Sequence, residues 1–249
     1  LSFMLENLAK PVVFTGSQIP IGVLRTDGRE NLITAIEIAG ARIGDRPEVP
    51  EVSLYFQNRL FRANRTTKRS AEALSAFRSY NYPPLAEVGV NIAYNLPAIL
   101  QPEESPAELR IATKLSGGIE LIKLFPGMGE EILRAMFSAP GLRAVVLETF
   151  GAGNAPTSEW FIRVIEEAVA RGIILFNITQ CGGGRVSMEL YETGLKLQKN
   201  RRPVRLRHDH RGSRDQTDVR TRAGASGRRD THASAQAPAR RIYGISHCT

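Results

Sequence analysis

Residues 1–200 contain no histidine, and this absence restricts the chemistry that they can carry out. All four histidines lie beyond that point: His208, His210, His232 and His247. A Ser-His-Asp or Cys-His nucleophile pair, or a zinc site built from histidine, therefore cannot be assembled within residues 1–200. Any acid–base chemistry there depends on Lys, Tyr, Asp or Glu side chains.

Cysteines and long apolar runs are also scarce. The two cysteines, Cys181 and Cys248, lie on opposite sides of a change in composition at Arg201, which argues against a disulfide framework and for a reducing, cytoplasmic compartment. No run approaches the roughly 18 apolar residues of a membrane span, and the opening LSFML lacks the basic leader of a signal peptide. We expect no membrane association, and nothing suggests a metal or an organic cofactor.

The positive charge is confined to one end of the chain. The formal net charge is +8, and residues 201–249 alone hold 12 Arg, no Lys and 4 Asp, which is also +8. Residues 1–200 are therefore formally neutral, so the basic composition describes the tail and not the body.

Several segments of the body follow an α/β rhythm, in which a short apolar run meets a glycine-containing turn and a helical pattern follows. Residues 11–14 (PVVF) read as a strand that ends at Thr15-Gly16-Ser17. A helix is predicted over residues 30–41, with Leu32, Ile33, Ile36 and Ala39 at helical spacing. Residues 51–56 read as a strand, and prolines with acids from 97 to 106 indicate a linker.

The same rhythm continues beyond the linker. Residues 119–125 and 144–150 read as strands that run into loops, and Thr157 or Ser158 can cap a helix that Gly172 ends. Its buried stripe is predicted to be Phe161, Val164, Ile165, Ala168 and Val169. A strand over residues 173–178 then completes a parallel βαβ unit, in which ligands bind beyond the strand carboxyl ends.

The segment RLFRANRTTK, residues 59–68, brings four basic side chains together with Asn64, Thr66 and Thr67. One interpretation is a solvated basic loop. The other is that Lys68 is partly buried beside hydroxyls and acts as a base, since desolvation lowers a lysine pKa towards neutrality. A body without histidine needs such a lysine to activate a Thr or Ser nucleophile.

Six strings, in this order and spacing, resemble the type I L-asparaginase family: LSFMLENL, KPVVFTGSQIP, RTDGRENL, NRTTK, TFGAGNAP and NITQC. They span residues 1–200 almost without gaps. The resemblance implies a two-domain α/β amidohydrolase with parallel sheets and flanking helices. Its reaction converts asparagine to aspartate and ammonia, using a Thr nucleophile and a Thr-Lys-Asp proton relay. It also implies a homodimer or homotetramer with sites between subunits.

Site residues follow from the resemblance position by position. Lys68 matches the catalytic lysine, Ser17 matches the residue whose backbone lines the substrate pocket, and Asn154 matches the asparagine that the second domain contributes. The alternatives are a turn residue for Ser17 and an Asn that tolerates a left-handed turn for Asn154. Thr67 and Cys181 match positions that hold an allosteric asparagine in one bacterial branch.

Two features depart from the family's pattern. Glu148 stands where that branch has an effector-binding Arg, so we expect this regulation to be lost, with Cys181 a small buried residue. The family's Thr-Gly-Gly-Thr-Ile and Gly-Thr-Asp-Thr-Met strings, which carry both threonines and the Asp, do not occur in this sequence. We therefore expect a fragment that is inactive and poorly folded, and Leu1 reads as lying within a helix.

The sequence predicts four segments. Residues 1–96 are the back part of an asparaginase N-terminal domain, 97–118 a linker, 119–200 a truncated C-terminal domain, and 201–249 an Arg-rich, disordered tail. A one-nucleotide shift of the back-translated tail permits GVRYDYDMTTEAAVTKLMYVLG, which resembles the family's continuation, so a frameshift near residue 200 is one hypothesis.

Two other functions stay open. The basic tail could bind nucleic acid through phosphates, although Tyr243 is its only aromatic residue, so nucleic acid is not the favoured partner. The amidase subunit of a transfer-RNA amidotransferase uses a related module and is the second alternative.

Overall fold

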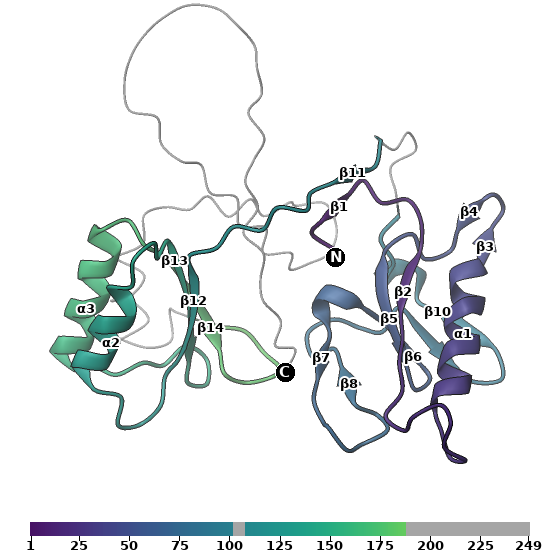
Figure 1. Ribbon diagram of the computed structural model, residues 1–249, viewed down its shortest axis with the longest axis horizontal. Helices are drawn as coiled ribbons and strands as arrows, with labels where there is room; N and C mark the ends of the chain where they lie inside the picture. The colour runs from purple at the N-terminus through teal and green to yellow at the C-terminus, as the bar shows by residue number, and fades with distance from the viewer. Residues whose placement is uncertain (102–107, 188–249) are drawn as a thin grey trace, which may run out of the picture. The chain divides into compact units, whose positions relative to one another are not determined.

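The computed structural model describes residues 1–101 and 108–187, which divide into two compact units at Lys114 and Leu115 (Figure 1). Residues 201–249, which the tail and frameshift hypotheses concern, lie outside the described residues. Within them, no helix is long and apolar enough to cross a membrane. The domain limits drawn from the sequence stay predictions.

A five-stranded sheet forms the centre of the first unit, in the order β10-β9-β6-β5-β2. Its strands are β2 (Val12–Phe14), β5 (Val52–Phe56), β6 (Arg59–Arg62), β9 (Ala86–Val88) and β10 (Ile92–Tyr94). Strands β2 and β5 are parallel, but the other pairs are antiparallel. The sheet is mixed because Gln57 and Asn58, both with positive φ, turn β5 directly back into β6. The α/β fold class is confirmed, but this sheet is mixed where a parallel sheet was expected.

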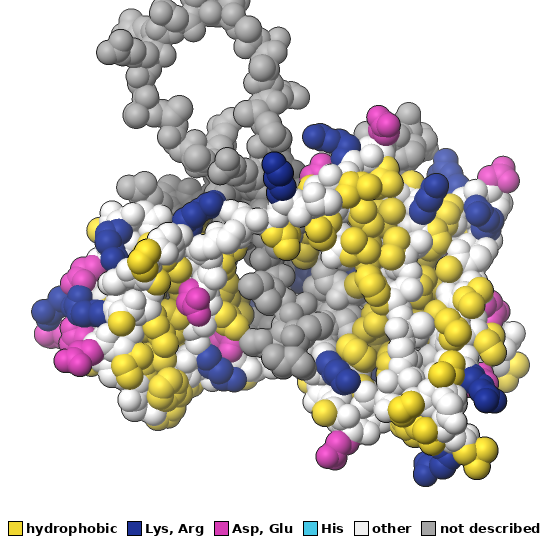
Figure 2. All heavy atoms as spheres, in the orientation of Figure 1, with side chains coloured by type: hydrophobic (Ala, Val, Ile, Leu, Met, Phe, Trp, Pro, Cys, Tyr) yellow, Lys and Arg dark blue, Asp and Glu magenta, His cyan; other side chains and the backbone are white. Residues whose placement is uncertain are grey.

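Helix α1 (Gly28–Gly40) packs against β2 and β5. Asn31, Ala35 and Ile38 face the sheet and are buried. The apolar residues at helical spacing lie on the other side, where Ile33 and Ile36 are 61% and 64% exposed. In the view of Figure 2, the largest group of hydrophobic side chains on the first unit lies over β2, and fewer lie over α1. The spacing predicted the helix correctly, but these residues are not its buried face.

The core of the first unit lies between α1 and the sheet. Its buried members are Ala35, Ile38, Val49, Tyr55, Leu60, Leu85, Ala86, Ala98 and Ile99. Short elements surround it: β3 (Arg42–Ile43) with β4 (Arg46–Pro47), β7 (Thr67–Lys68) with β8 (Phe77–Arg78), and the 3-10 turns Ala63–Arg65 and Leu96–Ala98.

The first residues form a turn and a strand, not the helix that the sequence suggested. Strand β1 (Leu5–Glu6) pairs antiparallel with β11 (Arg110–Ile111), which lies within the predicted linker. A strand that pairs over more than 100 residues leaves no local pattern in the sequence, so this pairing was not foreseen.

The second unit is built on three parallel strands in the order β12-β13-β14. These are β12 (Ile119–Lys123), β13 (Ala144–Thr149) and β14 (Ile174–Thr179), with helices α2 (Glu130–Phe137) and α3 (Glu159–Ala170). The predicted βαβ unit is confirmed: Phe161, Val164, Ile165 and Ala168 of α3 are buried, and Gly172 adopts a φ of +88° just after the helix. Val169 is only half-buried, and Ser158, which precedes α3, makes no side-chain cap hydrogen bond, so the expected cap is wrong. Figure 1 shows both helices beside the sheet.

Gly118, at the start of β12, gives a stability prediction. Its φ is +79°, and a Cβ there would meet the carbonyl oxygen of Gly141, which is backbone and cannot move away easily. Gly118→Ala should therefore lower the free energy of unfolding by about 2–4 kcal/mol in urea denaturation. Gly117→Ala is the matched control, because a Cβ at Gly117 meets nothing within 4 Å. Equal losses for the two variants would contradict this account.

Candidate functional site

The loop that contains Ser17 begins where β2 ends, and we call residues 15–19 the Ser17 loop. Because β2 and β5 are parallel neighbours, their carboxyl ends lie at one edge of the sheet, where ligands of α/β proteins bind. Thr15 fixes the start of the loop, since its hydroxyl donates to the carbonyl of Tyr55 on β5 at 3.0 Å. Ser17 itself is exposed.

The Asp27 carboxylate binds the part of the Ser17 loop that follows Ser17. It accepts hydrogen bonds from the backbone amides of Gln18, at 3.1 Å, and Ile19, at 3.0 Å. Burial alone raises the pKa of the Asp27 carboxyl, but these amides and the Asn31 side chain favour the charged form and bring the pKa below the ordinary 3.8.

Asn31, in the first turn of α1, forms hydrogen bonds with the same loop. Its side-chain NH₂ donates to the carbonyl of Gly16 at 2.9 Å and to Asp27 at 3.2 Å. Its side-chain oxygen accepts the amide of Gln57 at 3.1 Å, in the turn between β5 and β6. The buried Asn31 therefore joins the loop, the helix and the hairpin turn.

Lys68 lies on the two-stranded hairpin of β7 and β8, which we call the Lys68 hairpin. Its side chain is exposed, so the expectation that Lys68 is partly buried beside hydroxyls is wrong. The ammonium group lies 5.9 Å from the centre of the Phe77 ring, the residue paired with Lys68 across the hairpin. An aromatic face attracts a cation at this distance and limits where the long side chain points.

The Ser17 loop and the Lys68 hairpin contact each other directly. The Gln18 side-chain amide donates to the carbonyls of Ala71, at 2.8 Å, and Ala73, at 3.1 Å, in the segment that joins β7 to β8. Phe77 packs on Phe56 with ring centres 5.0 Å apart. The structure thus brings Ser17 and Lys68, two residues singled out from the sequence, onto neighbouring loops of one unit.

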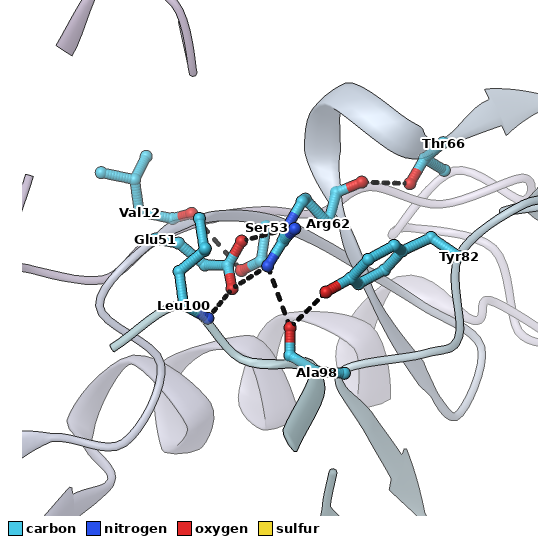
Figure 3. A network of polar contacts seen from close by, with 8 residues as sticks. All are labelled: Val12, Glu51, Ser53, Arg62, Thr66, Tyr82, Ala98 and Leu100. Carbon is cyan, nitrogen blue, oxygen red and sulfur yellow. Dashed lines mark hydrogen bonds and ion pairs between the residues drawn. The ribbon is translucent and has the colours of Figure 1, made fainter. Parts of the chain in front are cut away.

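The segment that leads to Lys68 begins after Arg62, which forms a buried ion pair with Glu51 (Figure 3). The Arg62 guanidinium contacts the Glu51 carboxylate at 2.6 Å, with side chains only 5% and 6% exposed. Arg62 also donates to the carbonyl of Ala98 at 2.9 Å and lies over the ring of Tyr82 at 4.3 Å. Figure 3 shows these groups converging from β6 and the segments around them.

The same network includes Thr66, which lies two residues before Lys68. The Thr66 hydroxyl donates to the carbonyl of Arg62 at 2.7 Å, and the Leu100 amide donates to Glu51 at 2.9 Å. The Arg62–Glu51 pair therefore holds both the turn that precedes Lys68, through the Arg62 carbonyl, and the segment from Ala98 to Leu100.

In the second unit, Asn154 lies in the loop after β13 and forms an isolated bridge with Phe150. It is not among the residues with positive φ, which in this loop are Gly151 and Gly153. The alternative that Asn154 serves a left-handed turn is therefore wrong. The end of β13 is fixed by Thr149, fully buried, whose hydroxyl contacts the side-chain oxygen of Asn177 at 2.6 Å.

The two residues named for an effector lie in different units. Thr67 is half-buried on β7, and Cys181 follows β14. Cys181 is exposed, so the expectation of a buried cysteine is wrong. Glu148 is buried at 7% exposure near the end of β13, and its carbonyl accepts the Gln180 side-chain amide at 3.0 Å.

Sequence reasoning missed Asp27 and the Glu51–Arg62 pair as parts of this region. Asp27 lies in the motif RTDGRENL directly before a helix, a position that normally indicates a cap and not a contact with the preceding loop. Glu51 and Arg62 lie in two apolar strands, and a charged residue there is a local indication of a buried partner. Among residues 1–101 and 108–187, no group of His, Cys, Asp and Glu could hold a metal ion.

Two family models match the chain. Residues 1–100 match the asparaginase N-terminal domain, and residues 118–202 match the glutaminase/asparaginase C-terminal domain. The crystal structure of L-asparaginase I from Vibrio cholerae has a TM-score of 0.69 with this chain at 39% identity, covering 80% of this chain and 57% of that one.

Three relatives show the range of names in this group. L-asparaginase 1 of Escherichia coli K12 is 42% identical over 198 residues, which are 79% of this chain and 56% of that protein. The mouse 60 kDa lysophospholipase is 42% identical over 79% of this chain and 34% of its own length. A glutamyl-tRNA(Gln) amidotransferase subunit of Pyrococcus abyssi is more distant, at 31% over 80% and 45%. The chain spans between 34% and 56% of these relatives.

Proposed function

The chain belongs to the asparaginase family, and from this membership and the contact between the Ser17 loop and the Lys68 hairpin we propose that it carries the lysine and part of the pocket of an L-asparaginase. The reaction is the hydrolysis of L-asparagine to L-aspartate and ammonia. The hydrogen bonds from Gln18 to Ala71 and Ala73 carry this proposal, because they hold a pocket loop against the hairpin that bears the lysine proposed as base.

Each residue has a defined role in the proposed reaction. Lys68 takes the proton from a threonine hydroxyl as its oxygen attacks the amide carbon of asparagine, and the proton then passes to the nitrogen that leaves as ammonia. Water releases the acyl group as aspartate. Ser17 and Asn154 bind the substrate. Thr67 precedes the lysine in the chain. Cys181 corresponds to a position that holds an allosteric effector, but Glu148 stands where the effector-binding Arg would be.

The threonine nucleophile is not supplied by any Thr-Gly-Gly-Thr or Gly-Thr-Asp-Thr string in these 249 residues. We therefore propose that the chain by itself does not turn over asparagine. The exposed apolar side chains of α1, Leu32, Ile33 and Ile36, support contact with further polypeptide, since patches of this kind mark interfaces. A cytoplasmic homodimer or homotetramer is the assembly that we propose.

A chimera tests this function. In it, the 198 matched residues of Escherichia coli L-asparaginase 1 are replaced by those of this chain. We expect ammonia and aspartate to form in equal amounts from L-asparagine, measured by a coupled assay, and the 249-residue chain alone to release none above buffer.

Two further substrates in the same assay separate the alternatives. L-glutamine is tested by ammonia release, and a lysophospholipid at the same concentration is tested by fatty-acid release. A folded chimera that hydrolyses either of these and not asparagine would contradict the proposal. Ammonia release by the chain alone would contradict the need for an added nucleophile.

A further inference from the structure

Asp27 occupies the position before α1 where a side chain normally caps the helix, yet it does not cap it. Its carboxylate makes no hydrogen bond to the first amides of α1, and its backbone has α-helical angles, with φ −83° and ψ −7°. A capping residue usually has extended angles and accepts an amide two or three residues later. The carboxylate is turned instead towards the Ser17 loop.

Hydrogen bonds enclose Ser17 on both sides in sequence. After it, the amides of Gln18 and Ile19 donate to Asp27. Before it, the carbonyl of Gly16 accepts the side-chain amide of Asn31, which is itself bonded to Asp27. Carboxylate–amide hydrogen bonds are stronger than hydrogen bonds between neutral groups. They therefore leave the backbone of Ser17 less conformational freedom than it would have without Asp27.

The start of α1 also packs closely against Ser17. A Cβ added at Gly28 would lie 3.2 Å from the Cβ of Ser17 and 3.1 Å from the Thr26 hydroxyl. The Thr26 hydroxyl in turn donates to the carbonyl of Ile19 at 2.9 Å. The helix start and the loop therefore behave as one packed element around Ser17.

We propose that Asp27 is a positioning residue for substrate binding, which fixes the backbone of Ser17 by holding the amides that follow it, with Asn31 as a second support. This inference rests on the proposed function of Ser17. It predicts that loss of the Asp27 carboxylate weakens substrate binding more than it slows proton transfer at Lys68. The reason is that Asp27 holds the backbone amide of Gln18, whereas the Lys68 hairpin is contacted by the Gln18 side chain, which is not bonded to Asp27.

The first test needs no substitution and uses the 249-residue chain. In a ¹⁵N–¹H NMR spectrum, the amide protons of Gln18 and Ile19 should resonate downfield and move upfield together as acid protonates Asp27, at a pKa below 3.8. The two shifts should be lost in Asp27→Asn and kept in the matched control Asp45→Asn, which removes the same charge from an exposed turn. Amide shifts in the unaltered chain that do not follow a carboxyl titration would overturn the proposal.

A serine at this position separates loop positioning from helix capping. Serine is as good a cap as aspartate, but its side chain is shorter and uncharged, so it cannot reach the Gln18 and Ile19 amides with a charge-assisted hydrogen bond as the carboxylate does. Asp27→Ser should therefore keep the thermal midpoint of the chain and lose the Gln18 and Ile19 shifts. If Asp27→Ser retains both shifts, the carboxylate is not what holds the two amides and the proposal is wrong.

Kinetics in the chimera supply the functional readout. Asp27→Asn should raise KM for asparagine roughly tenfold and lower kcat by less than about threefold, the pattern of lost binding. Unchanged KM in a variant that has lost the two amide shifts would overturn the proposal. An inactive chimera with Asp27 intact contradicts the proposed function instead, and the NMR result on the chain then decides whether Asp27 holds the loop.

Discussion

Lys68→Ala should lower kcat for asparagine on the order of 10³-fold in the chimera, with little change in KM. This is the loss expected when a positioned proton acceptor is removed and the substrate contacts stay. The Lys68 side chain is exposed, so its removal should change the free energy of unfolding by no more than about 0.5 kcal/mol. Steady-state ammonia release and urea denaturation measure the two effects on one protein.

Two variants distinguish a base from a positive charge at this position. Lys68→Arg keeps the cation, but a guanidinium does not give up its proton in proteins, so kcat should stay as low as in Lys68→Ala. Arg69→Ala removes the exposed neighbouring cation and should leave kcat within about twofold. If Lys68→Arg restores activity, the residue acts through its charge, and its role as a base is refuted.

Arg62→Ala should destabilise the first unit by about 3–5 kcal/mol, the largest effect on stability that we predict. The change removes the cation from an ion pair that is nearly excluded from water, while the Leu100 amide still donates to the buried Glu51 carboxylate. It also takes a donor from the carbonyl of Ala98 and a cation from the ring of Tyr82. Urea denaturation followed by circular dichroism gives the free energy.

A second arginine on the same strand provides the matched control. Arg59 pairs with Glu87 at 3.6 Å, but the two side chains are 58% and 65% exposed, so Arg59→Ala should change the free energy of unfolding by less than about 1 kcal/mol. Replacing the buried pair as a whole, Glu51→Leu with Arg62→Met, should recover most of the loss, since apolar residues need no partner. Similar costs for Arg62→Ala and Arg59→Ala would refute the account.

The network around Arg62 also bears on the proposed chemistry. Because the Arg62 carbonyl accepts the Thr66 hydroxyl, the turn that carries Thr67 and Lys68 starts from a point fixed inside the core. The hairpin beyond it is short and exposed, and it depends on Phe77 and Gln18 for its position. The hydrogen bond to Arg62 and the contacts of Phe77 and Gln18 together give a lysine on a surface hairpin a defined location.

The sequence by itself determined the local elements of this protein. The βαβ unit of the second unit follows from patterns that act over a few residues: the buried stripe of α3, its end at Gly172, and the apolar runs of β13 and β14. The strings around Ser17, Lys68 and Asn154 indicated the family through their resemblance to it and not through a local structural pattern.

Only the tertiary structure decided which side of a helix is buried and which polar groups meet. Residues 30–41 carry apolar side chains on more than one side, and packing against β2 and β5 selected the side with Asn31 and Ile38. The carboxylate of Asp27 could cap α1 or hold the loop, and the position of Gln18 and Ile19 favoured the loop. Such choices depend on contacts between residues distant in sequence, whose energies exceed the local preferences that a sequence pattern expresses.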